Sequence, residues 1–194
     1  RPPLHISPSP AWRGRVLNAL GAPIDGGGDV LPGTLASPMQ QHPPDALRRA
    51  RVERPTPTGV KVIDIFTPLC AGQRIGIFAG SGVGKSTLLG MLARAASFDT
   101  TVVALVGERG REVREFVDDI LGSALSNSVV VVATGDESPM MRRQAPRTAM
   151  AIAETFRDSG ENVLLIVDSI TRYAHALREV ALAAGEPPVA RGYA

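Results

Sequence analysis

One glycine-rich stretch, AGSGVGKST at residues 79–87, constrains the fold of this chain more than any other part of the sequence. The apolar run at 74–78 before it predicts a short buried strand, and the apolar residues that follow at helical spacing predict a helix. Glycine allows backbone angles that are closed to other residues, so several N–H groups can converge on a phosphate. The helix adds the positive end of its dipole. This pattern is typical of a phosphate-binding P-loop and predicts a nucleotide site.

The positions of this loop have separate expected roles. Lys85 would reach the β- and γ-phosphates of a bound nucleotide, and the Ser86 hydroxyl would bind Mg²⁺. The strict pattern begins with glycine and this chain has Ala79, but that position turns the chain without touching phosphate, so the departure is minor. The residues expected to bind nucleotide are Gly80, Ser81, Gly82, Val83, Gly84, Lys85, Ser86 and Thr87.

The rest of the chain alternates between predicted strands and predicted helices. Runs of β-branched and apolar residues predict buried strands at 101–106, 129–133 and 163–167. Repeated βα units of this length predict a mostly parallel sheet with helices on both faces, which is the α/β class. We further expect a strand at 14–18, a short helix from 58 that packs beside the P-loop strand, and helices over 113–121, from a start between 139 and 146, and over 170–184.

Composition narrows the function classes. At 194 residues the chain has room for one large α/β domain with a small appendage, and a net charge of +2 is too weak to argue for nucleic acid. The one cysteine, Cys70, rules out an intrachain disulfide, fits a reducing compartment and is expected to be a small core residue. No stretch approaches the ~18 continuous apolar residues of a transmembrane helix, and no signal-peptide pattern is present, so the expected location is the cytoplasm.

Charged residues follow two of the predicted strands. In a parallel α/β sheet, catalytic residues gather beyond the carboxyl ends of the strands. Glu108 and Arg109 come just after the strand that ends at 106, and Asp168 comes directly after the strand at 163–167. An aspartate at the end of an apolar strand downstream of a P-loop is the Walker B arrangement, which holds Mg²⁺ directly or through water. We therefore expect Asp168 to join Ser86 in binding the metal.

Spacing alone leaves two roles open for Glu108. It can orient or deprotonate a water in line with the γ-phosphate, or it can simply favour the N-terminus of the helix that starts near Arg111. Arg109 and Arg172 are similarly ambiguous, since each can stabilise phosphate charge or pair with an acid such as Asp168. The residues by themselves do not separate these alternatives.

The motifs together resemble the nucleotide domain of rotary-type ATPases, whose core is a RecA-like P-loop NTPase fold. Within that family they look like the type III export branch, and most of all like the flagellar protein-export ATPases, also called flagellum-specific ATP synthases. The resemblance covers residues 14–193. The segments that carry it are 14–26, 57–64, 72–86, 106–113 and 168–174, with 135–143 and 185–188 pointing to the flagellar rather than the injectisome type.

The resemblance implies an active ATPase that uses ATP and Mg²⁺. Glu108 would be the catalytic glutamate that positions the attacking water, and Lys85, Arg109 and Arg172 would complete the catalytic set. The family implies a homohexamer with each site at a subunit interface. It also implies the cytoplasmic face of the inner membrane at the flagellar base, where partner proteins would hold the ring. These partners would be the export gate, stalk and regulator proteins and the complexes of export chaperones with their substrates.

By the same resemblance, parts of the full-length protein lie outside this chain. Residues 1–13 are expected to be a linker from an N-terminal β-barrel, and residues 14–194 a partial RecA-like domain whose C-terminal part and helical C-terminal domain follow. The trans-acting arginine finger and the aromatic residues around adenine would also follow residue 194. An arginine finger is worth about 10³–10⁵ in rate, so we expect the isolated chain to be nearly inactive, to bind ATP weakly and to be largely monomeric.

Three other functions compete with this interpretation. An injectisome ATPase or a catalytic subunit of a rotary ATP synthase would share these motifs. A Rho-like RNA translocase shares the core but would need a platform of basic and aromatic residues, which these 194 residues do not show, so no nucleic-acid partner is expected. A non-catalytic nucleotide-binding subunit is disfavoured by Glu108, because such subunits of rotary ATPases typically lack a glutamate there.

Overall fold

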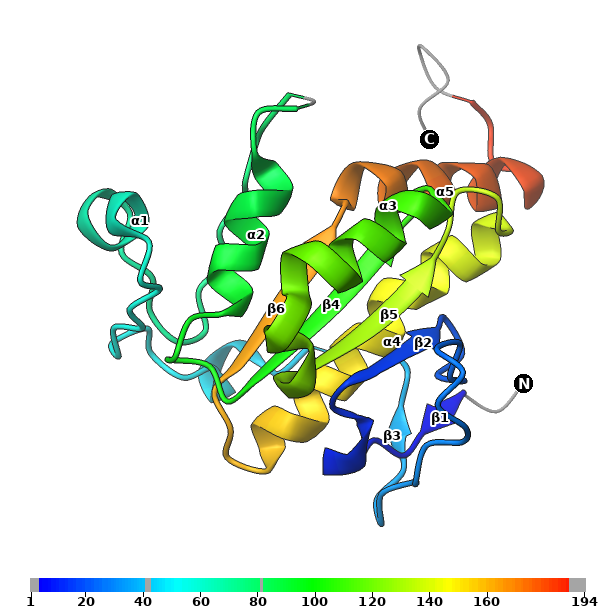
Figure 1. The fold of residues 1–194 in the computed structure, drawn as a ribbon. Coiled ribbons are helices and arrows are strands. Elements are labelled where there is room, and N and C mark those ends of the chain that lie inside the picture. The colour runs from blue at the N-terminus through cyan, green and yellow to red at the C-terminus, as the bar shows by residue number, and fades with distance from the viewer. Residues whose placement is uncertain (1–3, 41–42, 81, 189–194) are drawn as a thin grey trace.

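A parallel four-stranded sheet in the order β2-β5-β4-β6 forms the centre of the molecule (Figure 1). The structure is a computed structural model, and it describes residues 4–40, 43–80 and 82–188. The strands are β2 (Arg15–Asn18), β4 (Thr100–Val106), β5 (Ser128–Ala133) and β6 (Val163–Asp168), and every neighbouring pair runs parallel. The predicted α/β class is therefore confirmed, as are the strands expected near 14–18, 101–106, 129–133 and 163–167.

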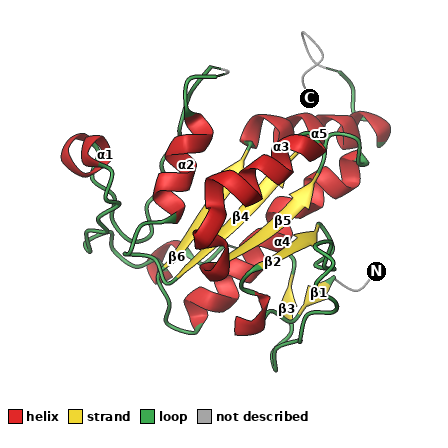
Figure 2. Ribbon diagram, viewed as in Figure 1, coloured by secondary structure: helices red, strands yellow, loops and turns green. Residues whose placement is uncertain are grey.

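Helices cover both faces of this sheet (Figure 2). The helix α4 (Pro139–Asp158) packs on one face with α5 (Ile170–Ala183) beside it, while α2 (Lys85–Ala93), α3 (Gly110–Glu115) and the π-helical turn after α3 (Phe116–Leu121) lie on the other. The expected start of α4 within 139–146 is confirmed at its first position, where the ring of Pro139 suits the first turn. Two further helical elements are α1 (Lys61–Phe66) and a 3₁₀ segment after the π turn (Gly122–Asn127).

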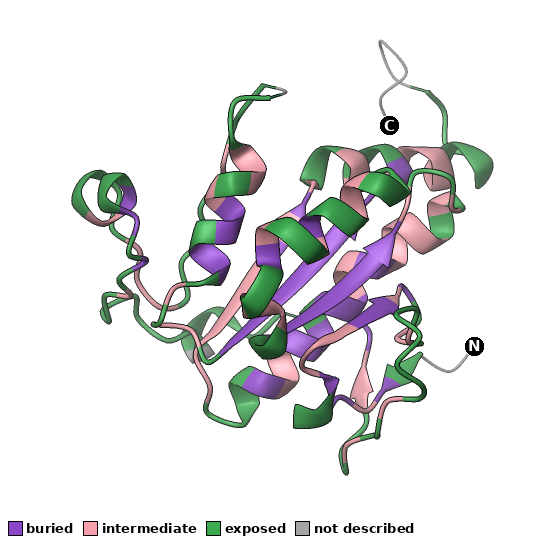
Figure 3. Ribbon diagram, viewed as in Figure 1, coloured by how far each residue is buried: buried purple, intermediate pink, exposed green. Residues whose placement is uncertain are grey.

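The two central strands are buried along their whole length (Figure 3). Because side chains alternate along a strand, β4 sends one set to each face. Val102 and Ala104 pack with the α4 layer, and Val103 and Leu105 pack with the α2 and α3 layer. A strand buried on both faces needs apolar residues at every position, which explains the unbroken apolar runs of the sequence.

The N-terminal residues pack against the α4 side of the sheet. The strand β1 (His5–Ile6) pairs antiparallel with β3 (Ser37–Pro38). A short 3₁₀ segment, Pro10–Trp12, comes between them in the chain, and a second, Ala46–Arg48, comes after β3. Ile6 and Trp12 are buried in the same cluster as the residues of α4, and the indole N–H of Trp12 donates to the carbonyl of Leu31 at 2.9 Å. The expected domain boundary at residue 14 stays a prediction.

The prediction of a strand at 74–78 is wrong. This segment has no strand geometry, and its side chains are largely exposed, with Phe78 at 97%. A strand requires hydrogen bonds to a neighbour, and this segment makes no pairing with β6, which is the nearest edge strand in the described part of the chain. The short helix expected beside it does form as α1, where Ile63 packs with Leu92 of α2, and Ile77 of the 74–78 segment packs against the same cluster.

Candidate active site

The loop before α2 has the backbone that its glycines predict. Gly82 and Gly84 adopt φ of +76° and +96°, in the left-handed region that favours glycine, and Gly84 is the N-cap residue directly before α2. A Cβ atom placed on either glycine, or on Gly80, would meet nothing within 4 Å. The N-cap residue Gly84 has no side chain that could cap α2, and among the described residues the first N–H groups of the helix are left available for an anion. Ser81 lies outside the described residues.

Lys85 and Asp168 form an ion pair across this site. Lys85 is the first residue of α2, and Asp168 is the last residue of β6. The aspartate side chain is only 6% exposed and the lysine side chain 32%, so the ammonium offsets the cost of burying the carboxylate. The structure thus brings together the P-loop and Walker B residues that the sequence predicted. Ser86 lies half-buried and Thr87 exposed in the same first turn of α2, and Val83 is 68% exposed.

Glu108 forms a second ion pair, with Arg172 of α5, near the carboxyl ends of the same parallel strands. A turn at Gly107, with φ of +71°, leads the chain out of β4, and the Gly107 N–H donates to the carbonyl of Ala133 at 2.6 Å. The N–H of Gly135 donates to the Glu108 carbonyl at 3.0 Å. These bonds fix the glutamate between the ends of β4 and β5, while α5 carries Arg172 to it from the end of β6.

The surroundings of Glu108 favour its protonated form. Burial raises the pKa of the Glu108 carboxyl, and the guanidinium of Arg172 opposes that rise. Contact with Glu112 and the negative charge of Asp168 raise the pKa of Glu108 further. The pKa of Glu112 is lowered, first by its contact with Glu108 and then by the backbone N–H of Arg109. A carboxylate that takes up a proton more readily is better suited to act as a general base near neutral pH.

Arg109 is the one predicted catalytic residue that the structure does not join to the others. Its side chain is 72% exposed and approaches only Glu112, at 3.9 Å, among the residues described. Its backbone N–H donates to the Glu112 carboxylate at 3.2 Å, which helps to begin α3. Glu112 is a site residue that was not predicted, although its position four residues after Glu108, at the start of a predicted helix, was a usable signal.

The site contains donors suited to Mg²⁺ but no preformed cluster of ligands. A hydroxyl on Ser86 and a carboxylate on Asp168 are hard oxygen donors of the kind this cation takes. Across the described ranges, no group of three or more His, Cys, Asp or Glu side chains lies together in a way that could hold a metal. A sparse protein contribution fits a cation that keeps several waters and is held largely by phosphate oxygens.

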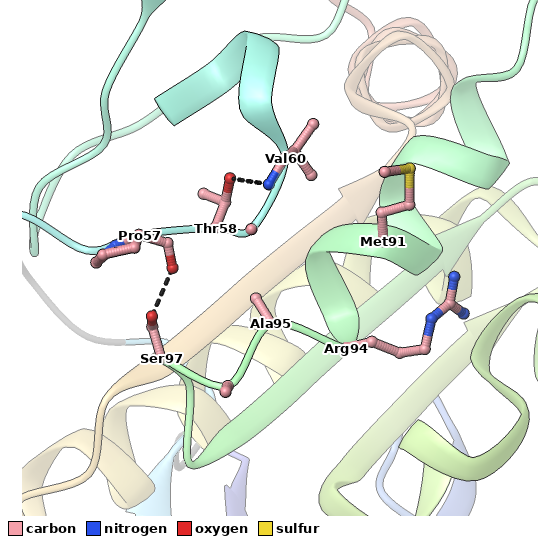
Figure 4. Close-up of a pocket in the computed structure, with 9 residues that line it drawn as sticks. Pro57, Thr58, Val60, Met91, Arg94, Ala95 and Ser97 are labelled. Atoms are coloured by element: carbon pink, nitrogen blue, oxygen red, sulfur yellow. Dashed lines mark hydrogen bonds between the residues drawn. The ribbon is translucent and has the colours of Figure 1, made fainter. Parts of the chain in front are cut away.

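A cavity of about 460 Å³ lies at the other end of α2, away from the P-loop (Figure 4). Its walls come from the segment before α1 and from the end of α2, where the Ser97 hydroxyl donates to the carbonyl of Pro57. Arg94 is its one charged residue, and the Arg94 guanidinium donates to the carbonyl of Ile120 at 2.6 Å. This cavity therefore has no connection to the residues that the P-loop and the strand ends bring together.

A parallel sheet with a P-loop before α2 and a buried aspartate at the end of β6 defines a P-loop NTPase fold of the α/β class. Residues 59–194 match the nucleotide-binding domain of the ATP synthase alpha/beta family. The chain belongs to this family, as its resemblance to the rotary-type ATPases implied.

Relatives of this chain carry flagellar and type III secretion names. It is 63% identical over 189 residues to the flagellum-specific ATP synthase of Agrobacterium fabrum and 65% identical to that of Rhizobium meliloti. These alignments cover 97% of this chain and 40% of each relative, so the chain spans less than half of their length. It is also 53% identical to the type 3 secretion system ATPase of Xanthomonas euvesicatoria, covering 98% of this chain and 43% of that protein.

Solved structures of similar fold come from type III secretion systems. A prototypical ATPase from the type III secretion system of pathogenic bacteria superposes on this chain with a TM-score of 0.90 at 48% identity, over 98% of this chain and 55% of that one. The assembled ATPase EscN in complex with its central stalk EscO, from enteropathogenic E. coli, gives a TM-score of 0.90 at 47% identity, over 98% and 47%. Within residues 4–40, 43–80 and 82–188, no helix has the length and apolar character needed to cross a membrane.

Proposed function

We propose that this chain is the nucleotide-binding part of an ATPase that hydrolyses ATP with Mg²⁺ to support export of flagellar proteins through the type III secretion apparatus. One observation carries the catalytic part of this proposal. Glu108 lies partly buried at the end of β4, in contact with Arg172 and close enough to Asp168 for the negative charge of Asp168 to raise its pKa. A carboxylate in that position, next to a P-loop, is placed to orient the water that attacks a γ-phosphate.

The remaining residues have roles that follow from their chemistry. The N–H groups from Gly80 to Thr87 would bind phosphate oxygens, and the ammonium of Lys85 would bind the β- and γ-phosphates. Ser86 and Asp168 would hold Mg²⁺, which when bound neutralises phosphate charge. Arg172 would hold Glu108 in place and, with Arg109, stabilise the charge that develops on the phosphate.

The full-length protein is proposed to act as a homohexamer, on the cytoplasmic face of the inner membrane at the flagellar base. The similar ATPase EscN has been solved as an assembled ATPase and in complex with a central stalk, which supports both a ring and a stalk partner for this protein. The flagellar export gate, regulator proteins and chaperone–substrate complexes are the further proposed partners, with no nucleic acid among them. A neighbouring subunit would supply the arginine finger.

A virulence injectisome is the second candidate setting for the same chemistry. The Xanthomonas secretion ATPase and the Caulobacter vibrioides flagellar protein are each 53% identical to this chain, so identity at that level does not separate the two systems. The 63% and 65% identity to two flagellar relatives favours the flagellar setting. Deletion of the gene should abolish flagellar filaments while leaving effector secretion intact, and the reverse result would select the injectisome.

Glutamine substitution at Glu108 in the full-length protein tests the catalytic proposal. Glu108→Gln keeps the size of the side chain but removes the carboxylate, so we expect phosphate release to fall by about 10²–10⁴-fold while binding of a fluorescent ATP analogue is retained. Glu115→Gln is the matched control, because Glu115 is an exposed glutamate of α3, and it should leave the rate unchanged. Wild-type turnover by Glu108→Gln would remove Glu108 from the mechanism.

A further inference from the structure

The carboxylate of Asp168 is already paired with a positively charged side chain. The ammonium of Lys85 forms an ion pair with it, and the aspartate side chain is almost completely buried, at 6% exposure. A carboxylate at such a depth requires a compensating positive charge or strong hydrogen bonds. Among the interactions of the described residues, the contact from Lys85 is the one side-chain bond made by the Asp168 carboxylate. The ammonium of Lys85 therefore lies against the carboxylate that a divalent cation would need as a ligand.

The two possible ligands of this site make opposite demands on Lys85. A divalent cation that arrives alone must displace the ammonium from Asp168, which leaves a partly buried lysine facing a second positive charge. A polyphosphate bound at the N-terminus of α2 instead offers the ammonium a new partner, since Lys85 is the first residue of that helix and Gly84 leaves its N–H groups uncapped. Movement of Lys85 to the phosphate frees the carboxylate for the cation.

We infer that Lys85 acts as a stand-in cation, which closes the metal site to free divalent ions until a polyphosphate occupies the P-loop. This inference rests on the proposed nucleotide site. It predicts a positive coupling between the two ligands, because each ligand is bound better once the other has broken or replaced the ion pair. Such coupling is reciprocal, so the metal must also raise the affinity for the polyphosphate by the same factor.

The coupling can be measured by titrating Mn²⁺ into the full-length protein and following free Mn²⁺ by electron paramagnetic resonance, which does not depend on turnover. Without nucleotide, we expect the wild-type protein to bind Mn²⁺ at least about tenfold more weakly than Lys85→Met. Lys61→Met is the matched control, because it removes the same charge from an exposed position on α1, and it should behave as wild type. Because tripolyphosphate chelates Mn²⁺ by itself, protein-bound metal is separated from the free chelate by ultrafiltration, and adding tripolyphosphate should then raise the Mn²⁺ affinity of the wild-type protein at least about tenfold.

Two further variants identify the carboxylate and the charge. Lys85→Met combined with Asp168→Asn should lose the Mn²⁺ binding that Lys85→Met gained, and Lys85→Arg, which keeps the positive charge, should exclude Mn²⁺ as the wild type does. Equal Mn²⁺ binding by wild type, Lys85→Arg and Lys85→Met would overturn the inference, as would tripolyphosphate that leaves the wild-type affinity unchanged. Failure of the wild-type protein to bind ATP or tripolyphosphate at all would instead overturn the proposed function.

Discussion

The carboxylate of Glu108, just beyond β4, is paired with the guanidinium of Arg172 in the first turn of α5. This contact joins the ends of two neighbouring parallel strands, because α5 follows directly after β6 and β6 pairs with β4. The proposed catalytic carboxylate is therefore held by a residue that lies far from it in the sequence. Substitutions that disturb the pair should affect turnover more than folding.

Removal of Arg172 should slow hydrolysis strongly. Arg172→Ala leaves Glu108 without its cation and removes a charge next to the proposed phosphate site, so we expect the turnover of the full-length protein to fall by about 10²–10³-fold. Arg111→Ala, at an exposed position of α3, removes the same charge and should cost less than about twofold. Phosphate release by Arg172→Ala within twofold of wild type would contradict the role given to the ion pair.

The pH dependence of turnover should report the environment of Glu108. Because burial raises its pKa, the carboxyl becomes protonated, and loses its function as a base, at a higher pH than an ordinary glutamate. Turnover should therefore rise with pH through this raised pKa. In Arg172→Ala the pKa of Glu108 should rise further, since the opposing cation is gone, and the acidic limb of kcat/KM should move to higher pH. A limb that moves to lower pH would show that another group titrates.

Gly107→Ala should separate activity from stability. Gly107 has φ of +71°, and an added Cβ would lie 2.9 Å from Cδ of Arg172, so the arginine must move away from Glu108. Gly160→Ala is the matched control, because Gly160 has φ of +91° but its Cβ would meet nothing within 4 Å. Each substitution should lower the free energy of unfolding by about 1–2 kcal/mol, while only Gly107→Ala should slow hydrolysis. Equal rates for the two variants would argue against the Gly107 contact.

Asp25 should contribute stability that depends on pH. Its carboxylate accepts hydrogen bonds from Arg15 at 2.7 and 2.8 Å and from the N–H groups of Val16 and Gly27, and these bonds lower the pKa of Asp25. A lowered carboxyl pKa gives stability that is complete above the ordinary value and is lost as pH falls below it.

The corresponding variants are Asp25→Asn and, as a control, Asp29→Asn at an exposed neighbouring position. Asp25→Asn should lower the free energy of urea unfolding by about 1 kcal/mol at pH 7, a value kept modest because the pair lies near the surface. The difference from wild type should shrink as pH falls below about 4. A difference that stays constant from pH 7 to pH 2 would show that the hydrogen bonds, and not the charge, matter.

The sequence by itself determined the layered α/β fold and the end of the sheet, at the carboxyl ends of its strands, where the site forms. The β-branched apolar runs of β4 and β5 predict strands buried on both faces, and the glycines of the P-loop predict a turn into a helix. Once β4 and β6 are parallel neighbours, Glu108 and Asp168 must lie close together, because one comes just after β4 and the other ends β6. Lys85 follows no strand, and it joins them through the ion pair that α2 makes with Asp168.

The tertiary structure decided what local pattern cannot express. Residues 74–78 are apolar enough for a strand, but a strand exists only where the segment pairs with a neighbour, and this segment leaves the edge of β6 unpaired in the described sheet. Arg109 and Arg172 were equivalent candidates in the sequence, yet the direction of α5 carries Arg172 to Glu108 while the first turn of α3 directs Arg109 to solvent. Side-chain partners across strands depend on how helices leave the sheet, and that is a property of packing rather than of sequence spacing.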